Sequence, residues 1–161
     1  TLHWFFNNFQ HPHRLKLLYV AASFLNQASW WVKNSPGNGE ADTRAPQGAS
    51  SLSPHDIIKR LDEATMAFKP VESVAWTRAY LEGGYDRKPL VQALALSAAK
   101  LSNDTHNQEL ASCLLEDYLQ SQAADRETLL LACAQHTAGH AKYGDTQAAY
   151  RGFMEALRLS C

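Results

Sequence analysis

Apolar and polar positions repeat with the period of an α-helix along almost the whole chain. The pattern predicts helices over residues 2–9, 12–32, 54–68, 71–81, 86–101, 104–121, 126–143 and 146–159. Ser53 before Pro54 is typical of a helix start, and the pair Gly83-Gly84 is typical of a helix end. We therefore predict an all-α fold, either an antiparallel helical bundle or a short α-solenoid of about seven to eight helices.

Residues 34–53 interrupt this pattern with Gly, Pro and Ser and no apolar period. We expect a flexible loop or linker here, between N-terminal helices over 1–33 and a helical-hairpin array over 54–161 that forms one domain with them. The stretch 15–32 is the most apolar part of the chain, but its polar residues favour a central, buried helix over a membrane span. The chain starts at Thr1 without an initiator Met, which indicates a fragment of a longer protein.

Charge and cysteine content exclude several classes of function. Lys and Arg number 15 against 16 Asp and Glu, a formal charge of −1, so we expect no nucleic-acid footprint and no polybasic membrane patch. The three cysteines lack CxxC spacing, which argues against a zinc site and favours buried thiols in a reducing, cytoplasmic setting. Seven histidines beside only 19% charged residues are the unusual feature.

The sharpest histidine signal lies in the helix over 126–143. His136 and His140 are four residues apart, on the same side as Leu129, Cys133 and Tyr143. Such a pair can chelate a metal ion, and one histidine suffices as an axial ligand of haem. No Glu lies between them to act as a base, and the alternative is a core-facing histidine bonded to a backbone carbonyl. We assign no metal ligand set here and leave a metal or haem at this pair open.

The preceding helix carries a second mixed stripe. His106 and Asp117 share a predicted face with Leu110, Cys113 and Leu114. His106 lies in the first turn, where the helix dipole disfavours its protonated form. A buried Asp117 needs a cationic or hydrogen-bonding partner, whereas at the edge of the stripe it stays solvated.

The N-terminal helix places polar side chains among aromatic ones. His3, Asn7 and Gln10 repeat at helical spacing between Trp4 and the phenylalanines at positions 5, 6 and 9. This row either lines a cavity or faces water. The remaining histidines, at positions 11, 13 and 55, are expected at the surface.

Several short motifs resemble the helical domain of questin oxidase-like proteins. They also resemble the helical domain that follows a Rieske iron–sulfur module in bacterial Rieske-type proteins. The motifs are His3-Trp4-x-x-x-Asn7, Phe24-Leu25-Asn26, Leu101-Ser102-Asn103-Asp104-Thr105-His106 and His140-Ala141, in order along most of the chain. The resemblance implies an oxidoreductase-type protein with His3, Asn7, His106 and His140 around a pocket, and a Rieske module elsewhere in the parent protein. The segment 34–53 departs from the compact pattern that this resemblance implies.

Two functional hypotheses follow from these observations. In the first, His106, His140 and His3 act as proton-transfer groups in a pocket for a small apolar or aromatic ligand. Asn7, His136, Tyr143 and Asp117 then serve as binding residues, with Asn7 or Tyr143 holding an oxyanion. In the alternative, the row Gly144, Ala149, Phe153 and Ala156 indicates a tetratricopeptide-like interaction module without catalysis.

Overall fold

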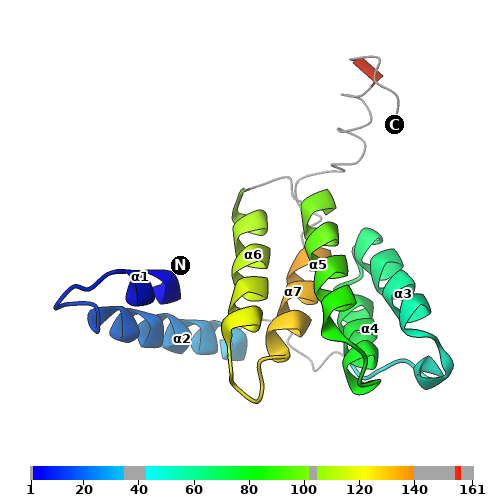
Figure 1. Cartoon of the computed structure of the whole chain (residues 1–161), viewed down its shortest axis with the longest axis horizontal. Coiled ribbons are helices and arrows are strands. Elements are labelled where there is room, and N and C mark those ends of the chain that lie inside the picture. Colours follow the sequence, from blue (N-terminus) through cyan, green and yellow to red (C-terminus); the bar gives the residue numbers. More distant parts are fainter. Residues whose placement is uncertain (1, 35–42, 102–104, 140–154, 157–161) are drawn as a thin grey trace. The chain divides into compact units, whose positions relative to one another are not determined.

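The computed structural model describes residues 2–34, 43–101, 105–139 and 155–156 (Figure 1). Side chains are described over 5–30, 43–101, 109–139 and 155–156. These ranges contain seven α-helices and one 3₁₀-helix, and no strand. The all-α prediction is confirmed. By its internal contacts the chain divides into two units, Thr1–Ala41 and Asp42–Cys161, which are described separately below.

The first unit is a pair of helices, α1 (Leu2–Asn8) and α2 (Lys16–Asn34). In the bend between them, the backbone N–H of Arg14 donates to the carbonyl of His11 at 2.9 Å. The Arg14 guanidinium lies 5.3 Å from the ring centroid of Phe6, a cation–π contact. Phe5 and Phe9 stack at a centroid distance of 5.3 Å.

The prediction that 15–32 forms a central, buried helix is wrong. Leu18 is 53% exposed, Phe24 66% and Leu25 71% in the structure. The physical reason is the size of the unit: the seven residues of α1 are too few to cover the nineteen residues of α2. An apolar sequence predicts a preference for burial, but it does not provide the neighbour that buries it.

The described part of the second unit, up to residue 139, is a bundle of five α-helices with α7 (Thr128–Gly139) at its centre. Its other helices are η1 (Ala49–Ser51), α3 (Pro54–Met66), α4 (Pro70–Glu82), α5 (Arg87–Leu101) and α6 (Thr105–Gln120). α7 packs mainly against α4 and α6 and also contacts α3 and α5. In a solenoid each repeat contacts only its neighbours, so of the two predicted architectures the structure has the bundle.

The core of this bundle is built from large side chains on all five helices. Leu90, Leu130 and Cys133 have no exposed surface, and Ile57 and Leu94 are almost as deeply buried. Burying a side chain of this size contributes about 1.5–3 kcal/mol to the free energy of unfolding. The sequence predicted Cys133 as a buried thiol, and both Cys133 and the half-buried Cys113 are free.

Small hydroxyl side chains join three helices inside the bundle. The hydroxyls of Thr65 on α3 and Ser73 on α4 lie 2.8 Å apart, and Ser73 also donates to the carbonyl of Ala134 on α7 at 3.4 Å. Thr77 donates to the carbonyl of Ser73 at 2.9 Å. A buried polar group needs such a partner, so these short side chains let α3, α4 and α7 approach closely without leaving unsatisfied donors.

The helix ends of α3 and α4 follow the sequence prediction closely. Ser53 caps α3, and its hydroxyl oxygen accepts from the backbone N–H of Asp56 at 3.2 Å. Gly84, just after α4, has a φ of +69°, which favours glycine over other residues. At Gly83, a Cβ atom would overlap the ring of Tyr85, so the close approach of that ring favours a glycine.

The segment expected to be a linker is structured from residue 43 onward. The guanidinium Nε of Arg78 on α4 donates to the carbonyl of Thr43 at 3.0 Å, and Ala49 in η1 is buried in the core. Residues 43–53 therefore belong to the bundle of the second unit. The predicted helix over 146–159 lies outside the described residues, apart from the helical positions Glu155 and Ala156.

Candidate functional site

The helical hairpin of α6 and α7 places two of the predicted site residues toward the same end. The two helices pack against each other and run in opposite directions, joined by residues 121–127 (Figure 1). The first turn of α6, which contains His106, therefore lies at the same end of the hairpin as the last turn of α7, which contains His136. The backbone thus brings to one end two positions that are far apart in the sequence.

His136 lies at the edge of the buried face of α7. The side chain is half-buried, and its Nε2 atom has almost no exposed surface. Its neighbours on the helix, Cys133 and Thr137, are buried. The prediction that His136 shares a face with Cys133 is confirmed. His136 lies in the last turn of α7, the end of a helix at which the dipole favours a positive charge.

The thiol of Cys133 is held in its neutral form. Removal from solvent raises the pKa of the Cys133 thiol to about 11, and the nearby hydroxyl of Thr137 acts in the opposite direction. A thiol with such a pKa is a poor nucleophile and a poor metal ligand at neutral pH. The sulfur next to His136 is therefore part of the core packing.

The buried face of α6 differs from the predicted stripe. Its buried residues are Ala111, Leu115 and Tyr118, whereas Leu110 is 44% exposed. The ring of Tyr118 takes an inner position, and the guanidinium of Arg126 lies 5.3 Å from its centroid, a cation–π contact. The placement of Leu110 on the inner face was wrong by about one helical position. Asp117 is half-buried at the edge of the observed face.

The remaining predicted site residues lie elsewhere or outside the described part of the chain. His3 and Asn7 belong to α1 in the first unit, where the side chain of Asn7 is exposed. Their convergence with His106 stays a prediction, because each unit is described by itself. His140 and Tyr143 lie outside the described residues, as do most of the tetratricopeptide-like positions. The three histidines expected at the surface are exposed, namely His11, His13 and His55.

Within the described residues, no group of three or more His, Cys, Asp or Glu side chains is arranged to hold a metal ion. The hypothesis of a metal or haem at His136 and His140 depends on a residue outside that part of the chain. It therefore stays a prediction.

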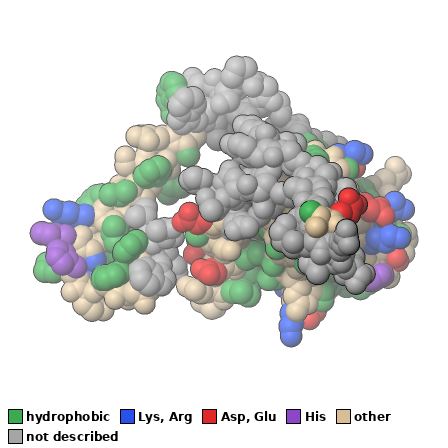
Figure 2. Space-filling model, turned by 90° about the horizontal axis from the view of Figure 1, so that it is seen from above, with side chains coloured by type: hydrophobic (Ala, Val, Ile, Leu, Met, Phe, Trp, Pro, Cys, Tyr) green, Lys and Arg blue, Asp and Glu red, His purple; other side chains and the backbone are tan. Residues whose placement is uncertain are grey.

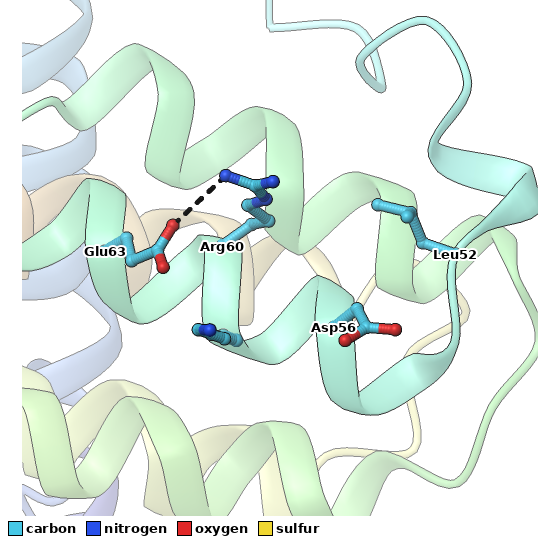
Figure 3. A pocket seen from close by; sticks show the side chains of 5 residues that line it. Leu52, Asp56, Arg60 and Glu63 are labelled. Atoms are coloured by element: carbon cyan, nitrogen blue, oxygen red, sulfur yellow. Dashed lines mark hydrogen bonds and ion pairs between the residues drawn. The ribbon is translucent and has the colours of Figure 1, made fainter.

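The described surface of the second unit has two hollows that the sequence did not predict. One, of about 310 Å³, lies along α3 and is lined by Leu52, Asp56, Lys59, Arg60 and Glu63 (Figure 3). Arg60 and Glu63 form an exposed ion pair across it at 3.4 Å. The other, of about 540 Å³, lies between residues 44–47 and α4.

The hollow along α3 does not have the character of a site for an aromatic ligand, whereas the lining beside α4 mixes apolar residues with three polar ones, Arg44, Gln47 and Glu72. Ligand sites are mostly apolar with a few converging polar groups. Charged side chains dominate the lining along α3, and Asp56 is already engaged with Ser53, whose hydroxyl donates to its carboxylate at 2.6 Å. In the sequence, Asp56, Lys59, Arg60 and Glu63 have the spacing of an ordinary solvated helix face, so no signal there indicated a site.

Comparison of the chain with protein-family models, with curated proteins and with solved structures found no match. The resemblance to questin oxidase-like and Rieske-associated helical domains therefore rests on the short motifs alone. Among the described helices, none is both long enough and apolar enough to cross a membrane.

Proposed function

We propose that the Asp42–Cys161 unit binds a small apolar or aromatic ligand at the end of the α6–α7 hairpin that contains His106 and His136. The antiparallel packing of α6 and α7 is the observation that carries this proposal. It supports a common location for two of the predicted histidines, and α7 ends one residue before His140. Together with the motif resemblance, this favours the helical domain of an oxidoreductase-type, questin oxidase-like protein.

The proposed chemistry is proton transfer to and from a phenolic ligand. An imidazole takes or gives a proton near neutral pH, which makes His106 or His140 suited to accept the proton of a phenol O–H. The product is a phenolate, whose oxygen needs a hydrogen-bond donor such as the Tyr143 hydroxyl. His136 lies toward the same end of the hairpin, whereas Asp117, in the last turn of α6, lies near the opposite end. His3, in the first unit, stays a proton-transfer candidate predicted from the sequence.

The test uses 2-naphthol as a phenolic probe, since its neutral and ionised forms fluoresce at different wavelengths. We expect the intact chain to bind naphthol and to increase the fraction of naphtholate emission. His106→Ala and His140→Ala should each weaken binding about tenfold or remove the naphtholate signal. His55→Ala is the matched control, because His55 is exposed on α3, away from the hairpin end.

Circular dichroism of each variant separates loss of the site from loss of the fold. If His106→Ala and His140→Ala keep the helicity and bind naphthol as the unaltered chain does, the histidine-pocket proposal fails. If His3→Ala has the same effect as His106→Ala, the first unit contributes to the site, as the motif resemblance implies.

A second candidate function, a helical interaction module without catalysis, is favoured by the exposed apolar side chains of α2. Folded proteins seldom expose so many large apolar side chains on one helix without a binding partner. The bundle packing of α7 against α4 and α6 gives no support to the tetratricopeptide-like version of this alternative. The two candidates are tested by different substitutions, because the interaction surface lies on α2 and the ligand site is defined by histidines of the α6–α7 hairpin.

A further inference from the structure

The charges of the chain are distributed unevenly between its two ends. Three of the 15 Lys and Arg residues and none of the 16 Asp and Glu residues fall within the first 34 positions. The segment 1–34 therefore carries a formal charge of +3, and the rest of the chain carries −4. The near-neutral total conceals a cationic N-terminal segment without a single carboxylate side chain.

The same segment contains half of the aromatic residues. Eight of the sixteen Phe, Trp and Tyr side chains lie within it, among them Trp4, Trp30 and Trp31. Trp and Tyr are enriched where a protein meets the interface between lipid and water, because one part of the ring is apolar and another is polar. Aromatic residues and cations without acidic residues are typical of helices that lie on anionic membranes.

The structure exposes the apolar side chains of α2 on two sides. Leu18 and Leu25 are seven residues apart and lie on one face, while Val20 and Phe24 are four apart and lie on another. All four are exposed, whereas Leu17 and Ala21 between these faces are half-buried. Figure 2 shows hydrophobic side chains spread over this unit, with Lys, Arg and His side chains gathered at one end.

The described part of the second unit has no apolar surface of similar extent. Its exposed large apolar side chains are scattered over three helices, at Val71, Leu96, Leu110 and Leu119. Of the two surface hollows described above, the one along α3 is lined largely by charged residues, and the one beside α4 by small apolar residues together with Arg44, Gln47 and Glu72. A second copy of the chain is therefore a poor partner for α2. Its second unit has the opposite charge, but its described residues form no apolar patch that matches the exposed faces of α2.

We propose that the pair of helices α1 and α2 binds to the surface of an anionic lipid bilayer, with α2 lying in the plane of the interface. The apolar faces of α2 enter the boundary between headgroups and acyl chains. Lys16, which is exposed, is placed to face anionic headgroups, and the net charge of +3 over residues 1–34 adds to the attraction. This mode needs no membrane-spanning helix, in agreement with the length and polarity of the described helices.

The size of the lipid preference follows from the charge. Each Lys or Arg near an anionic surface favours binding about fivefold at physiological ionic strength. Three such residues predict affinity for anionic vesicles that is on the order of a hundredfold higher than for neutral ones, and the difference shrinks in high salt.

The experiment measures flotation of the intact chain with vesicles of phosphatidylcholine alone or with about a third phosphatidylserine. Tryptophan emission gives a second readout, because three of the four Trp residues lie in the segment and Trp76→Phe removes the fourth. We expect flotation and a blue shift with anionic vesicles only. Leu18→Asp with Leu25→Asp should abolish both, and Lys16→Glu should remove most of the preference for phosphatidylserine.

The matched control is Leu96→Asp with Leu110→Asp, which changes charge equally at two exposed leucines of the second unit. This double variant should float as the unaltered chain does. Circular dichroism shows whether each variant is folded. If the double leucine variant does not fold, Lys16→Glu still tests the proposal, because it leaves the apolar side chains of α2 unchanged. Flotation with neither vesicle type overturns the proposal. The proposal is also overturned if sedimentation shows a concentration-dependent dimer that Leu18→Asp with Leu25→Asp dissociates, because α2 is then an interface between protein chains.

Discussion

At the scale of single residues, deep burial makes Cys133 chemically unreactive. Its thiol pKa of about 11 lies two units above the ordinary value of 9.0, so the thiolate fraction at neutral pH falls about a hundredfold. We expect alkylation of Cys133 by iodoacetamide to be at least about a hundredfold slower than that of an ordinary thiol, because its thiol is also out of reach of the reagent, and slower than that of the half-buried Cys113. Mass spectrometry of the labelled peptides measures both rates in one sample.

Unfolding the chain in guanidinium is the control for this experiment, and both cysteines should then react at similar rates. Equal labelling of Cys113 and Cys133 in the folded protein would contradict the buried environment of α7.

The N-cap of α3 is a second residue whose contribution is measurable. Ser53 accepts from the backbone N–H of Asp56 and donates to its carboxylate, which lowers the pKa of Asp56. Ser53→Ala should reduce the free energy of unfolding by about 1 kcal/mol. Because the folded-state pKa of Asp56 is lowered, its share of this stabilisation is present above pH 3.8 and is lost as the pH falls further.

Urea titrations at pH 7 and at pH 3 measure the effect of Ser53→Ala. Ser50→Ala, at an exposed serine just before α3, is the control and should change the free energy of unfolding by less than about 0.5 kcal/mol. If the two variants are equally stable at pH 7, the cap does not stabilise α3.

These residue-scale examples show which features a sequence can predict. The cap at Ser53 and the turn at Gly84 depend on neighbours within a few positions, and both were predicted correctly. Which side of α6 faces inward depends on Tyr118 and its contact with Arg126 in the loop before α7. Whether the side of α6 with Leu110 or the side with Tyr118 is buried is decided by three-dimensional packing. Helical periodicity alone therefore misplaced the buried face of α6.

At the scale of elements, one arginine connects three parts of the second unit. Arg87, at the start of α5, donates to the carbonyl of Leu81 on α4 at 3.1 Å and to that of Tyr85 at 2.6 Å. It also forms an ion pair with Glu127, just before α7, at 2.7 Å. The planar guanidinium satisfies all three partners at once, which an ammonium group at the end of a lysine does not.

We therefore expect Arg87→Lys to lower the free energy of unfolding by about 1.5–3 kcal/mol, the usual range for hydrogen bonds to a charged group. Arg60→Lys is the matched control, because Arg60 forms an exposed ion pair with Glu63 on the same helix, and such pairs contribute at most about 1 kcal/mol. Urea unfolding of the two variants gives the comparison. Equal stabilities would show that Arg87 does not connect α4, α5 and α7.

The packing order of the helices was the part of the fold that the sequence did not determine. Helix periods and caps located the elements to within a few residues. They gave no indication that α7 packs beside α4, because the two helices are distant in sequence and the small residues Ser73 and Ala134 at their contact have no distinctive pattern. The candidate site shows the same limit: the hairpin that brings His106 and His136 to one end is local, whereas any contribution from His3 requires long-range contacts.

At the scale of the whole molecule, the two units differ in how they bury their apolar residues. The core of the Asp42–Cys161 unit is formed by its own helices and by η1, whereas the apolar side chains of α2 stay largely exposed. A helix with few tertiary contacts is marginally stable in water, because most helical stability in proteins comes from packing. The second unit should therefore be the stable part of the chain.

We expect residues 42–161, produced alone, to unfold cooperatively with a melting temperature within about 4 °C of that of the whole chain. A change of that size corresponds to about 1 kcal/mol for a domain of this length. Circular dichroism melts of both proteins test this, and residues 1–41 alone should gain helicity only when anionic vesicles are added. A loss of cooperativity or a drop of more than about 10 °C in residues 42–161 would show that α2 supplies part of the core. The exposed faces of α2 would then have their partner within the chain, and binding to anionic vesicles would no longer be expected. The histidine site would need to be examined in both units together.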